Sequence, residues 1–227
     1  MRKKIFHWLG KEFVALSCEG KAGLNGTEET EEIFLRFSDE LKAIGLSLDN
    51  TVRTRLWTRD RESRNLASQV RTKILSGRAR SASSSYIAPV YFASEARVAL
   101  DLLAIKPTRP GLAKILKEYD PPVTPLRYVN YDSIVFLSGD SHAAPTLEDQ
   151  VNAIVPRLST SLEDAGTSWD KAVKISFFLH RSQTLNTLKE LFKAIVNVET
   201  PHLEYAFVDG YSREGKFIEI EVTASGS

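Results

Sequence analysis

Arginine offers the most conspicuous chemistry in this chain, because eight arginines lie within residues 53–80. A guanidinium group is planar and always charged, so it can hold a carboxylate through two parallel hydrogen bonds. A run of charges is more commonly a solvated helix face with its neighbouring loops. We expect the solvated arrangement for most of this stretch, with an anion-binding edge as the alternative. The arginines are Arg53, Arg55, Arg59, Arg61, Arg64, Arg71, Arg78 and Arg80.

The other reactive side chains form no recognisable catalytic motif. Ser83, Ser84 and Ser85 are consecutive, but no Gly-x-Ser-x-Gly elbow precedes a helix and no histidine is tied to them by a motif. We expect them at most to contribute hydroxyl groups to a cleft. The single cysteine, Cys18, has no partner for an intrachain disulfide, and no His/Cys cluster has the spacing of metal ligands. We expect neither a metal nor a cofactor.

The overall charge and hydropathy argue against several kinds of partner. The 30 basic and 29 acidic side chains give a formal charge of +1, so no field of one sign attracts nucleic acid or an anionic membrane. Lys11 and Glu12 interrupt the apolar run after the basic N-terminus before that run reaches the length of a signal peptide. Elsewhere there is no stretch of roughly 18 uncharged apolar residues. We therefore expect a cytoplasmic protein.

The sequence carries one pattern twice, at a constant separation of 121 residues. Residues 13–17 align with 134–138, and residues 41–52 align with 162–173, without any gap between the two blocks. A period this long indicates tandem domains, since the units of solenoid proteins have about 20–50 residues. The identical pairs are Val14/Val135, Leu16/Leu137, Ser17/Ser138, Leu41/Leu162, Gly45/Gly166, Ser47/Ser168, Asp49/Asp170 and Val52/Val173.

Hydrophobic periodicity predicts the element order ββαβαββ in each copy. The first helix is expected to begin at Thr27, as its N-cap, and to stop at Gly45. In residues 51–58, alternation places the arginines on the face opposite Val52 and Leu56. In the first copy we expect strands at 3–9, 12–19, 51–58, 82–88 and 96–105, and a second helix at 62–75. In the second copy we expect strands at 126–130, 133–138, 171–179, 203–209 and 216–224, and helices at 146–165 and 184–196.

The connection between the copies and the uncovered sheet faces complete the predicted architecture. Residues 106–125 contain five prolines and a short apolar stretch, which indicates a linker with one or two helical turns. If both helices of a copy cover one face of its sheet, the other face needs a cover as well. We expect that face to be buried against another sheet by association.

Several of these segments, in this order and spacing, resemble the Rid (YjgF/RidA-like) family, which includes enamine and imine deaminases and was long known as a group of endoribonucleases. In the second copy they are FLSGD at 136–140, the helix that contains Gln150 with the following LEDAGTSWDKAVKISFFL, and FIEIEVTA at 217–224. In the first copy they are VALSCEG, AIGLSLDNTVRTRL, SSSYIAP and RVALDLLA. The resemblance implies a chorismate-mutase-like domain with ligand clefts between neighbouring domains.

The resemblance also implies which positions carry the chemistry. In the family, an arginine at the start of the penultimate strand holds a substrate carboxylate, and a glutamate in the last strand helps to position the water that hydrolyses an imine. The segment ARS at 79–81 places Arg80 in the arginine context, and Glu219 stands at the glutamate position. Each copy lacks the other member of the pair, because Ala99 stands at the glutamate position of the first copy and Leu203 at the arginine position of the second.

Four further residues are candidate substrate-binding groups. Ser84 offers a hydroxyl group to a cleft. Tyr86 lies on a penultimate strand, where it faces either a cleft or, as we favour, the core. His202 adjoins the missing arginine and replaces part of its charge, unless it is an ordinary surface histidine. Asn186 matches an asparagine in the second helix of the family.

We therefore expect an α+β protein of two tandem ββαβαββ domains, at 1–107 and 126–227, joined by a linker at 108–125. The leading hypothesis is a hydrolase, a deaminase of reactive enamine or imine intermediates of small carboxylated metabolites, with Arg80 and Glu219 meeting in an inter-domain cleft. The alternatives are a non-catalytic metabolite-binding or scaffold protein with degenerate sites, and chemistry unlike that of the family. Because the family packs three domains around an axis, we expect a homotrimer.

Overall fold

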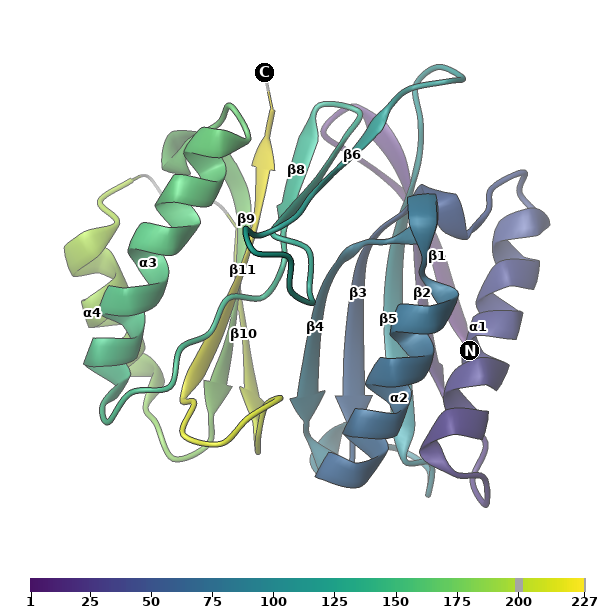
Figure 1. The fold of residues 1–227 in the computed structure, drawn as a ribbon, viewed down its shortest axis with the longest axis horizontal. Helices are drawn as coiled ribbons and strands as arrows, with labels where there is room; N and C mark the ends of the chain where they lie inside the picture. Colours follow the sequence, from purple (N-terminus) through teal and green to yellow (C-terminus); the bar gives the residue numbers. More distant parts are fainter. Residues whose placement is uncertain (199–201, 227) are drawn as a thin grey trace.

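The protein forms four layers, with two β-sheets face to face in the middle and a pair of helices outside each sheet. This arrangement is seen in a computed structural model that describes residues 1–198 and 202–226 (Figure 1). Each sheet with its two helices corresponds to one copy of the sequence repeat. The predicted fold class, two tandem α+β domains with helices on one face of each sheet, is confirmed.

The first domain has a five-stranded sheet in the order β1-β2-β5-β3-β4, with β3 and β4 parallel and the other neighbours antiparallel. Short 3-10 helices lie at Leu48–Asn50, Gly77–Ala79 and Pro89–Tyr91. The main elements are β1 (Arg2–Trp8), β2 (Lys11–Glu19), α1 (Gly26–Lys42), β3 (Thr51–Thr58), α2 (Arg61–Ile74), β4 (Ala82–Ile87) and β5 (Val98–Lys106).

The second domain has a six-stranded sheet in the order β10-β9-β11-β8-β7-β6, in which only β9 and β10 are parallel neighbours. A 3-10 helix at Trp169–Lys171 precedes β9. The main elements are β6 (Lys114–Lys117), β7 (Tyr128–Tyr131), β8 (Ile134–Leu137), α3 (Leu147–Asp164), β9 (Ala172–His180), α4 (Leu185–Ile195), β10 (His202–Val208) and β11 (Ile218–Ser225).

The segment between the copies differs from the expected linker. Residues 108–125 were expected to contain helical turns, but Lys114–Lys117 form strand β6, which pairs with β7 at the edge of the second sheet. Lys114 and Lys117 stand at the two ends of this strand, and lysine is a residue that edge strands commonly carry. The second domain therefore begins within the segment that was expected to be a linker.

The helix caps explain where the helices begin. The N-cap of α1 is Asn25 and not Thr27, because the Asn25 side chain accepts hydrogen bonds from the backbone of Thr27 and Glu28, and Glu28 reaches back to the Asn25 backbone. The expected cap of α3 is confirmed, since the Thr146 hydroxyl accepts from the backbone N–H of Asp149. Apolar side chains of α1 and α3 then pack onto the outer faces of the two sheets.

Successive side chains of a strand point alternately to the helices of their own domain and to the other domain. In β11, Ile218 and Ile220 pack into the core beneath α3 and α4, while Glu219 and Glu221 face the first domain. In β3, Leu56 packs beneath α1 and α2, while Arg53 and Arg55 face the second domain. The charged inner faces therefore meet each other between the sheets.

The two inner faces are joined by an apolar cluster and by backbone hydrogen bonds. The cluster includes Phe13 and Val52 of the first domain and Tyr131 and Phe136 of the second. At the edge of β4, Ile87 exchanges backbone hydrogen bonds of 2.9 and 3.1 Å with Gly210. The expectation that each sheet is buried against another sheet is therefore met within one chain.

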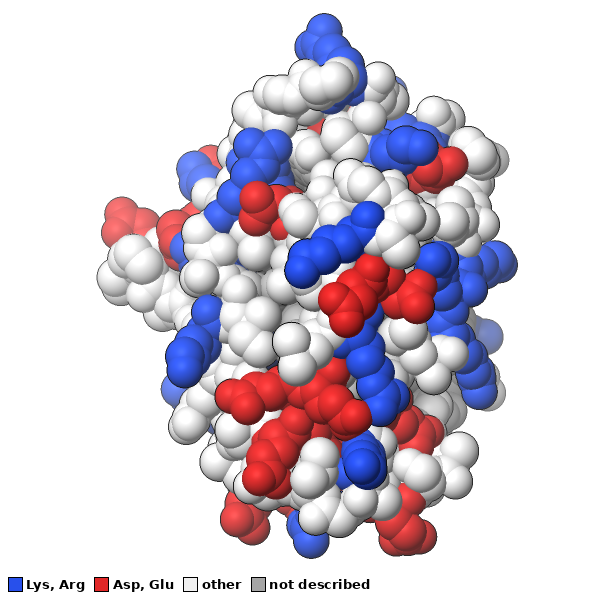
Figure 2. All heavy atoms as spheres, turned by 90° about the vertical axis from the view of Figure 1, so that its right-hand side faces the viewer, with Lys and Arg blue, Asp and Glu red and all other residues white. Residues whose placement is uncertain are grey.

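The surface outside the domain seam has mixed charge. Figure 2 shows the face that lies on the right of Figure 1, where basic side chains lie among acidic ones. Among the helices of residues 1–198 and 202–226, none has the length and hydropathy needed to cross a membrane.

Candidate functional site

Strand register relates the residues of one domain to those of the other. Arg55 pairs with Asp101 in the first sheet, and Ser176, the residue 121 positions later, pairs with Glu221 in the second. Likewise, Trp57 pairs with Ala99 in the first sheet, and Phe178, the residue 121 positions after Trp57, pairs with Glu219 in the second. Ala99 is thus the counterpart of Glu219, as the sequence comparison indicated, and Asp101 is the counterpart of Glu221.

Glu221 is a buried carboxylate that is held by two arginines of the other domain. It forms ion pairs with Arg53 and with Arg55, the latter at 2.8 Å from Nη2 to Oε2. The Ser84 hydroxyl donates a hydrogen bond of 2.5 Å to Oε1, and the Tyr86 hydroxyl lies 3.4 Å from the same atom. Burial alone would raise the pKa of Glu221, but the charges of Arg53 and Arg55 outweigh it and lower the pKa to about 2.

Arg55 extends this network to the edge of the second sheet. Its Nη2 donates hydrogen bonds of 2.9 Å to the Ser176 hydroxyl and 2.9 Å to Glu204 Oε2, and its guanidinium lies 4.9 Å from the centre of the Phe178 ring. Although burial opposes ionisation of Glu204, the nearby charge of Arg55 lowers its pKa to about 2. This network has an ion pair for each buried charge, which is the condition under which charges are tolerated inside a protein.

Glu219, two residues before Glu221 on the same face of β11, is in a contrasting state. Its side chain is buried, and among the described residues its Oε1 has no hydrogen-bond partner. Burial raises its pKa to about 7, and the neighbouring charge of Glu221 acts in the same direction, while Lys216 and the hydroxyls of Tyr86 and Ser141 act against it. A carboxyl group of this kind exchanges a proton near neutral pH, as a general acid or base requires.

A glycine provides the room for the Glu219 side chain. An added Cβ at Gly139 would overlap the carboxyl group of Glu219, so no larger residue fits there without movement. The Gly139 N–H donates a hydrogen bond of 3.3 Å to the Ser83 carbonyl of the first domain. The FLSGD segment therefore places the backbone of both domains close to Glu219.

Three cationic side chains surround Glu219 from different elements. Arg64 and Arg71 belong to α2, and Glu219 stabilises the charge of both. Arg71 donates a hydrogen bond of 2.6 Å to the Ser84 carbonyl, and burial lowers its pKa to about 10. Lys216 donates hydrogen bonds of 2.8 Å to the Ser141 hydroxyl and 3.1 Å to that of Ser212. Both domains thus contribute positive charge around one protonatable carboxyl group.

A small cleft of about 50 Å³ opens beside this site. Arg71, Arg80 and Ser83 line it from the first domain, and residues 124–126 line it from the second. It adjoins Glu219 through Ser83 and Gly139, which are hydrogen bonded to each other. The volume is sufficient for one or two water molecules, because one water occupies about 30 Å³ in the liquid.

Arg80 lies at this cleft but is engaged elsewhere. Its guanidinium makes a two-pronged ion pair with Glu118, with Nη2 and Oε2 3.1 Å apart. No hydrogen bond or ion pair joins it to Glu219 among the residues that the structure describes. Arg80 and Glu219 therefore border one seam without touching, and a negative group already occupies the arginine fork.

The register corrects the expected counterpart of Arg80. Ser83 pairs with Thr54 in the first sheet, and Leu203 pairs with Ile175, the residue 121 positions after Thr54, in the second. Leu203 is therefore the counterpart of Ser83 and not of Arg80. The position that matches Arg80, like Pro201, lies outside the described residues. Leu203 therefore does not mark the loss of an arginine from the second copy.

The remaining predicted residues divide into two groups. Ser84 and Tyr86 lie on β4 and reach Glu221, and the Tyr86 ring stacks on Phe178 of the other domain at 4.1 Å between ring centres. His202 begins β10 and lines a different cavity, and Asn186 is exposed on α4, on the outer side of the second sheet (Figure 1). The structure thus brings Ser84 and Tyr86 to the carboxylates but not His202 or Asn186.

Most residues of the ionic network were not predicted as site residues from the sequence. Arg53, Arg55 and Arg71 are buried or nearly buried, so the expectation of a solvated stretch is wrong for them, and Glu221 was not singled out. A signal for Glu221 was present, because Glu219 and Glu221 are two residues apart on a strand and must share a face. The two arginines of β3 share a face by the same rule.

Comparisons with known proteins give matches at the level of structure alone. No protein-family model and no curated protein matches the sequence. A YjgF/YER057c/UK114 family protein from Mycobacterium tuberculosis matches with a TM-score of 0.45 and 16% identity, over 50% of this chain and 99% of its own. TdcF from E. coli, solved with bound serine, matches with a TM-score of 0.43 and 20% identity, over 49% of this chain and 94% of its own.

A match of greater extent is to a chorismatase. The TM-score is 0.66 at 13% identity, and the match covers 98% of this chain and 79% of the chorismatase. The Rid-type structures each cover about half of the chain, whereas this one spans both sheets and all the helices. The chain therefore shares the chorismatase fold along nearly its whole length.

Proposed function

We propose that this protein is a Rid-like hydrolase that deaminates a reactive enamine or imine of a small carboxylated metabolite, with Glu219 as its general base. The observation that carries the proposal is the state of Glu219, which is buried between two domains with a pKa of about 7 and one unpartnered oxygen. A structural carboxylate such as Glu221 is instead fully paired and ionised.

The reaction follows from these groups. Water attacks the imine carbon while Glu219 accepts a proton from that water and passes it to the imine nitrogen, which becomes an amine. The resulting carbinolamine then loses ammonia and leaves a carbonyl group, so the net change is imine plus water to ketone plus ammonia. Arg71 and Arg80, which line the cleft beside Glu219, supply the positive charge for the substrate carboxylate.

Substrate access requires the cleft to open. The present space of about 50 Å³ is smaller than a carboxylated imine, and the Arg80 guanidinium is paired with Glu118. That ion pair is exposed to solvent, and water and salt weaken such pairs, so a substrate carboxylate can replace Glu118 at modest cost.

The test is the decay of 2-aminoacrylate or its imine, generated in solution, with and without the protein. We expect the protein to accelerate the decay, with a rate that rises with pH to a plateau above about pH 7, as the pKa of Glu219 predicts. Glu219→Gln should lower the rate roughly 100-fold or more, which is the usual contribution of a general base. Glu214→Gln, on an exposed side chain of the same domain, is the matched control and should leave the rate unchanged.

A second candidate is a non-catalytic protein that binds a carboxylated metabolite. It is favoured by the small size of the cleft and by the Arg80–Glu118 pair, which together leave no room for a substrate beside Glu219 in this conformation. In the same assay such a protein would leave the decay of the imine unchanged, and Glu219→Gln would have no effect on it.

The cytoplasmic location and the homotrimer expected from the sequence belong to the same proposal. The trimer was expected because the resembled family packs three domains around an axis. The separate need of each sheet for a cover is already met in part here, since the two sheets cover part of each other. Exposed apolar side chains remain on β1 and near the end of β4, namely Ile5, Val90 and Tyr91. Light scattering at micromolar concentration distinguishes three chains from one.

A further inference from the structure

We propose that a second cleft, between the inner faces of the two sheets, binds a small molecule with two anionic groups on a flat apolar body. This cleft has a volume of about 540 Å³, within the range of small-molecule sites. It is bounded by β1, β2, β3 and β5 on one side and by β9, β10 and β11 on the other. Glu219 is not among the residues that line it, so the inference goes beyond the proposed reaction site.

The lining of this cleft is strongly basic, although the chain as a whole is almost neutral. Its acidic member is Asp101, whose carboxylate accepts a hydrogen bond of 2.7 Å from the Trp57 indole. The basic side chains along it are Arg2, Lys4, His7, Arg53, Arg55, Lys174 and His202. Lys3 also borders it, but its ammonium group lies on the opposite face of the sheet, where it pairs with Glu40. A concentration of one charge in a concave, partly apolar space attracts ligands of the opposite charge.

The cationic side chains of this cleft differ in whether they already form an ion pair. Arg53 and Arg55 line the cleft but are already in ion pairs, Arg53 with Glu221 and Arg55 with Glu221 and Glu204. Lys174 forms an ion pair with Glu204, which is itself shared with Arg55. For Arg2 and Lys4, no ion pair is present in the described part of the chain. These two side chains on β1 are therefore available to a ligand.

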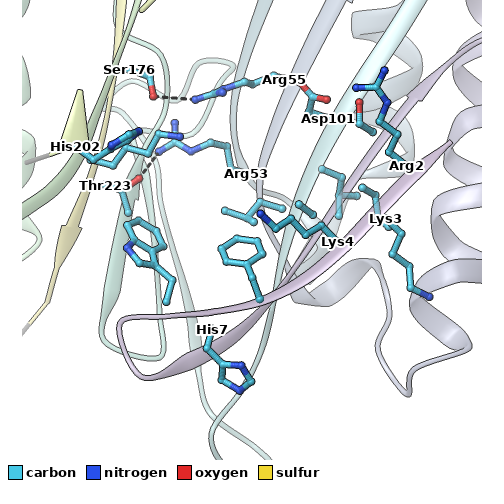
Figure 3. A pocket seen from close by; sticks show the side chains of 18 residues that line it. Arg2, Lys3, Lys4, His7, Arg53, Arg55, Asp101, Ser176, His202 and Thr223 are labelled. Atoms are coloured by element: carbon cyan, nitrogen blue, oxygen red, sulfur yellow. Dashed lines mark hydrogen bonds between the residues drawn. The ribbon is translucent and has the colours of Figure 1, made fainter. Parts of the chain in front are cut away.

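Strand geometry explains why Arg2 and Lys4 face the cleft. They alternate with Lys3, whose ammonium group pairs with Glu40 of α1 at 2.8 Å on the opposite face of the sheet. Figure 3 shows Lys4 and Arg53 projecting into the space between the sheets, while Lys3 and His7 point away from it. The cleft therefore has positive charge on the β1 wall, and His202 and Lys174 stand on the facing wall.

The apolar part of the cleft favours a flat ligand. Phe6 and Trp8 follow Arg2 and Lys4 on the same face of β1, and both rings pack on Phe13, at 5.6 and 5.5 Å between ring centres. Leu103 of β5 lines the same region. A planar ring can lie against these aromatic side chains while its acidic groups reach the cations on the two walls.

The experiment measures binding and uses no enzymatic readout, so its outcome is independent of the proposed hydrolysis. The probe is isophthalate, a benzene ring with two carboxylates, titrated calorimetrically into the intact protein at low ionic strength. We expect binding of isophthalate, weaker binding of benzoate and no binding of the uncharged isophthalamide. A second probe, 4-carboxyphenyl phosphate, has a phosphate in place of one carboxylate. If it binds more tightly than isophthalate, one of the two anionic groups of the ligand is a phosphate.

A matched pair of variants locates the site. Lys4→Gln removes a charge that faces the cleft, and Lys3→Gln removes the adjacent charge that faces the helices. We expect Lys4→Gln to weaken isophthalate binding about tenfold and Lys3→Gln to change it less than about twofold. Equal effects of the two variants, or equal binding of isophthalate and isophthalamide, would overturn the proposal. Circular dichroism of both variants checks that β1 keeps its place.

Discussion

At the residue scale, two glutamates separated by one residue have opposite electrostatic states. Glu221 contacts Arg53 and Arg55, so its pKa falls to about 2, whereas the cations around Glu219 do not compensate for its burial and its pKa rises to about 7. Pairs of carboxyl groups whose environments separate their pKa values in this way commonly divide the roles of acid, base and structural anchor. Here Glu221 joins the two domains through its ion pairs, and in the proposed reaction Glu219 is the group that exchanges the proton.

The raised pKa of Glu219 has a consequence for stability. Between its ordinary pKa of 4.5 and its folded pKa of about 7, the folded state holds a proton that the unfolded state releases. The free energy of unfolding therefore falls as the pH rises through this window, by about 3 kcal/mol in all, and the contribution is constant above it. Glu219→Gln should remove this decline. Urea denaturation of both proteins at several pH values between 4.5 and 8 measures it, and parallel curves would contradict it.

Gly139 should be sensitive to the smallest added side chain. An alanine Cβ there would overlap the Glu219 carboxyl group, so Gly139→Ala should lower the free energy of unfolding by about 1–3 kcal/mol, as overpacking does. Glu219→Ala removes the group that is struck. In the double variant the cost of Gly139→Ala should therefore largely disappear, and a cost that persists would mean that the strain lies elsewhere. Chemical denaturation of the four proteins in this cycle gives the coupling.

At the element scale, alternation along β3 and β11 determines both the core and the site. The sequence was sufficient to place these strands and to assign most of their faces, because the period of two is clear in TVRTRLWT and FIEIEVTA. Val52 was expected on the face opposite the arginines, but a bulge between Thr51 and Arg53 breaks the alternation and Val52 packs into the apolar cluster between the sheets. It was not sufficient to identify the partners, since Arg55 and Glu221 lie 166 residues apart and meet only through the packing of one sheet on the other. The linker was misjudged for a related reason, as its prolines obscured the four-residue strand β6.

Removing one partner of the ionic contact between β3 and β11 should lower the free energy of unfolding more than replacing both partners with apolar residues. Arg53→Ala would leave Glu221 buried with a smaller counter-charge, at a cost of about 3–5 kcal/mol in the free energy of unfolding. Arg109→Ala, at an exposed position, should change it by less than about 0.5 kcal/mol. Replacing the pair together, with Arg53→Met and Glu221→Leu, should cost less than Arg53→Ala alone. Thermal or urea denaturation compares the three variants, and a larger cost in the double variant would refute this assignment.

At the scale of the whole molecule, the two domains are parts of one folding unit. Their inner faces share an apolar cluster, the Arg53/Arg55–Glu221 network and the stacked rings of Tyr86 and Phe178. Lys11 and Asp132 form a further ion pair at 3.1 Å. They lie 121 residues apart and so occupy equivalent positions of the repeat, with opposite charges. Equivalent positions of the two copies thus contact each other across the domain seam, as Arg55 and Ser176 do as well.

Unfolding should therefore occur in one transition that includes both domains. Separation of the domains would expose the buried arginines and carboxylates together with the apolar cluster, so neither half is expected to remain folded after the other unfolds. Trp8 and Trp57 report on the first domain and Trp169 on the second. The variant Trp169→Phe and the variant with Trp8→Phe and Trp57→Phe then give one fluorescence probe for each domain. In urea, the fluorescence midpoint of each variant should coincide with the midpoint of its own far-ultraviolet circular dichroism. Midpoints that differ within one variant would show that the domains unfold separately, and that the charged contact between them contributes less to stability than its burial implies.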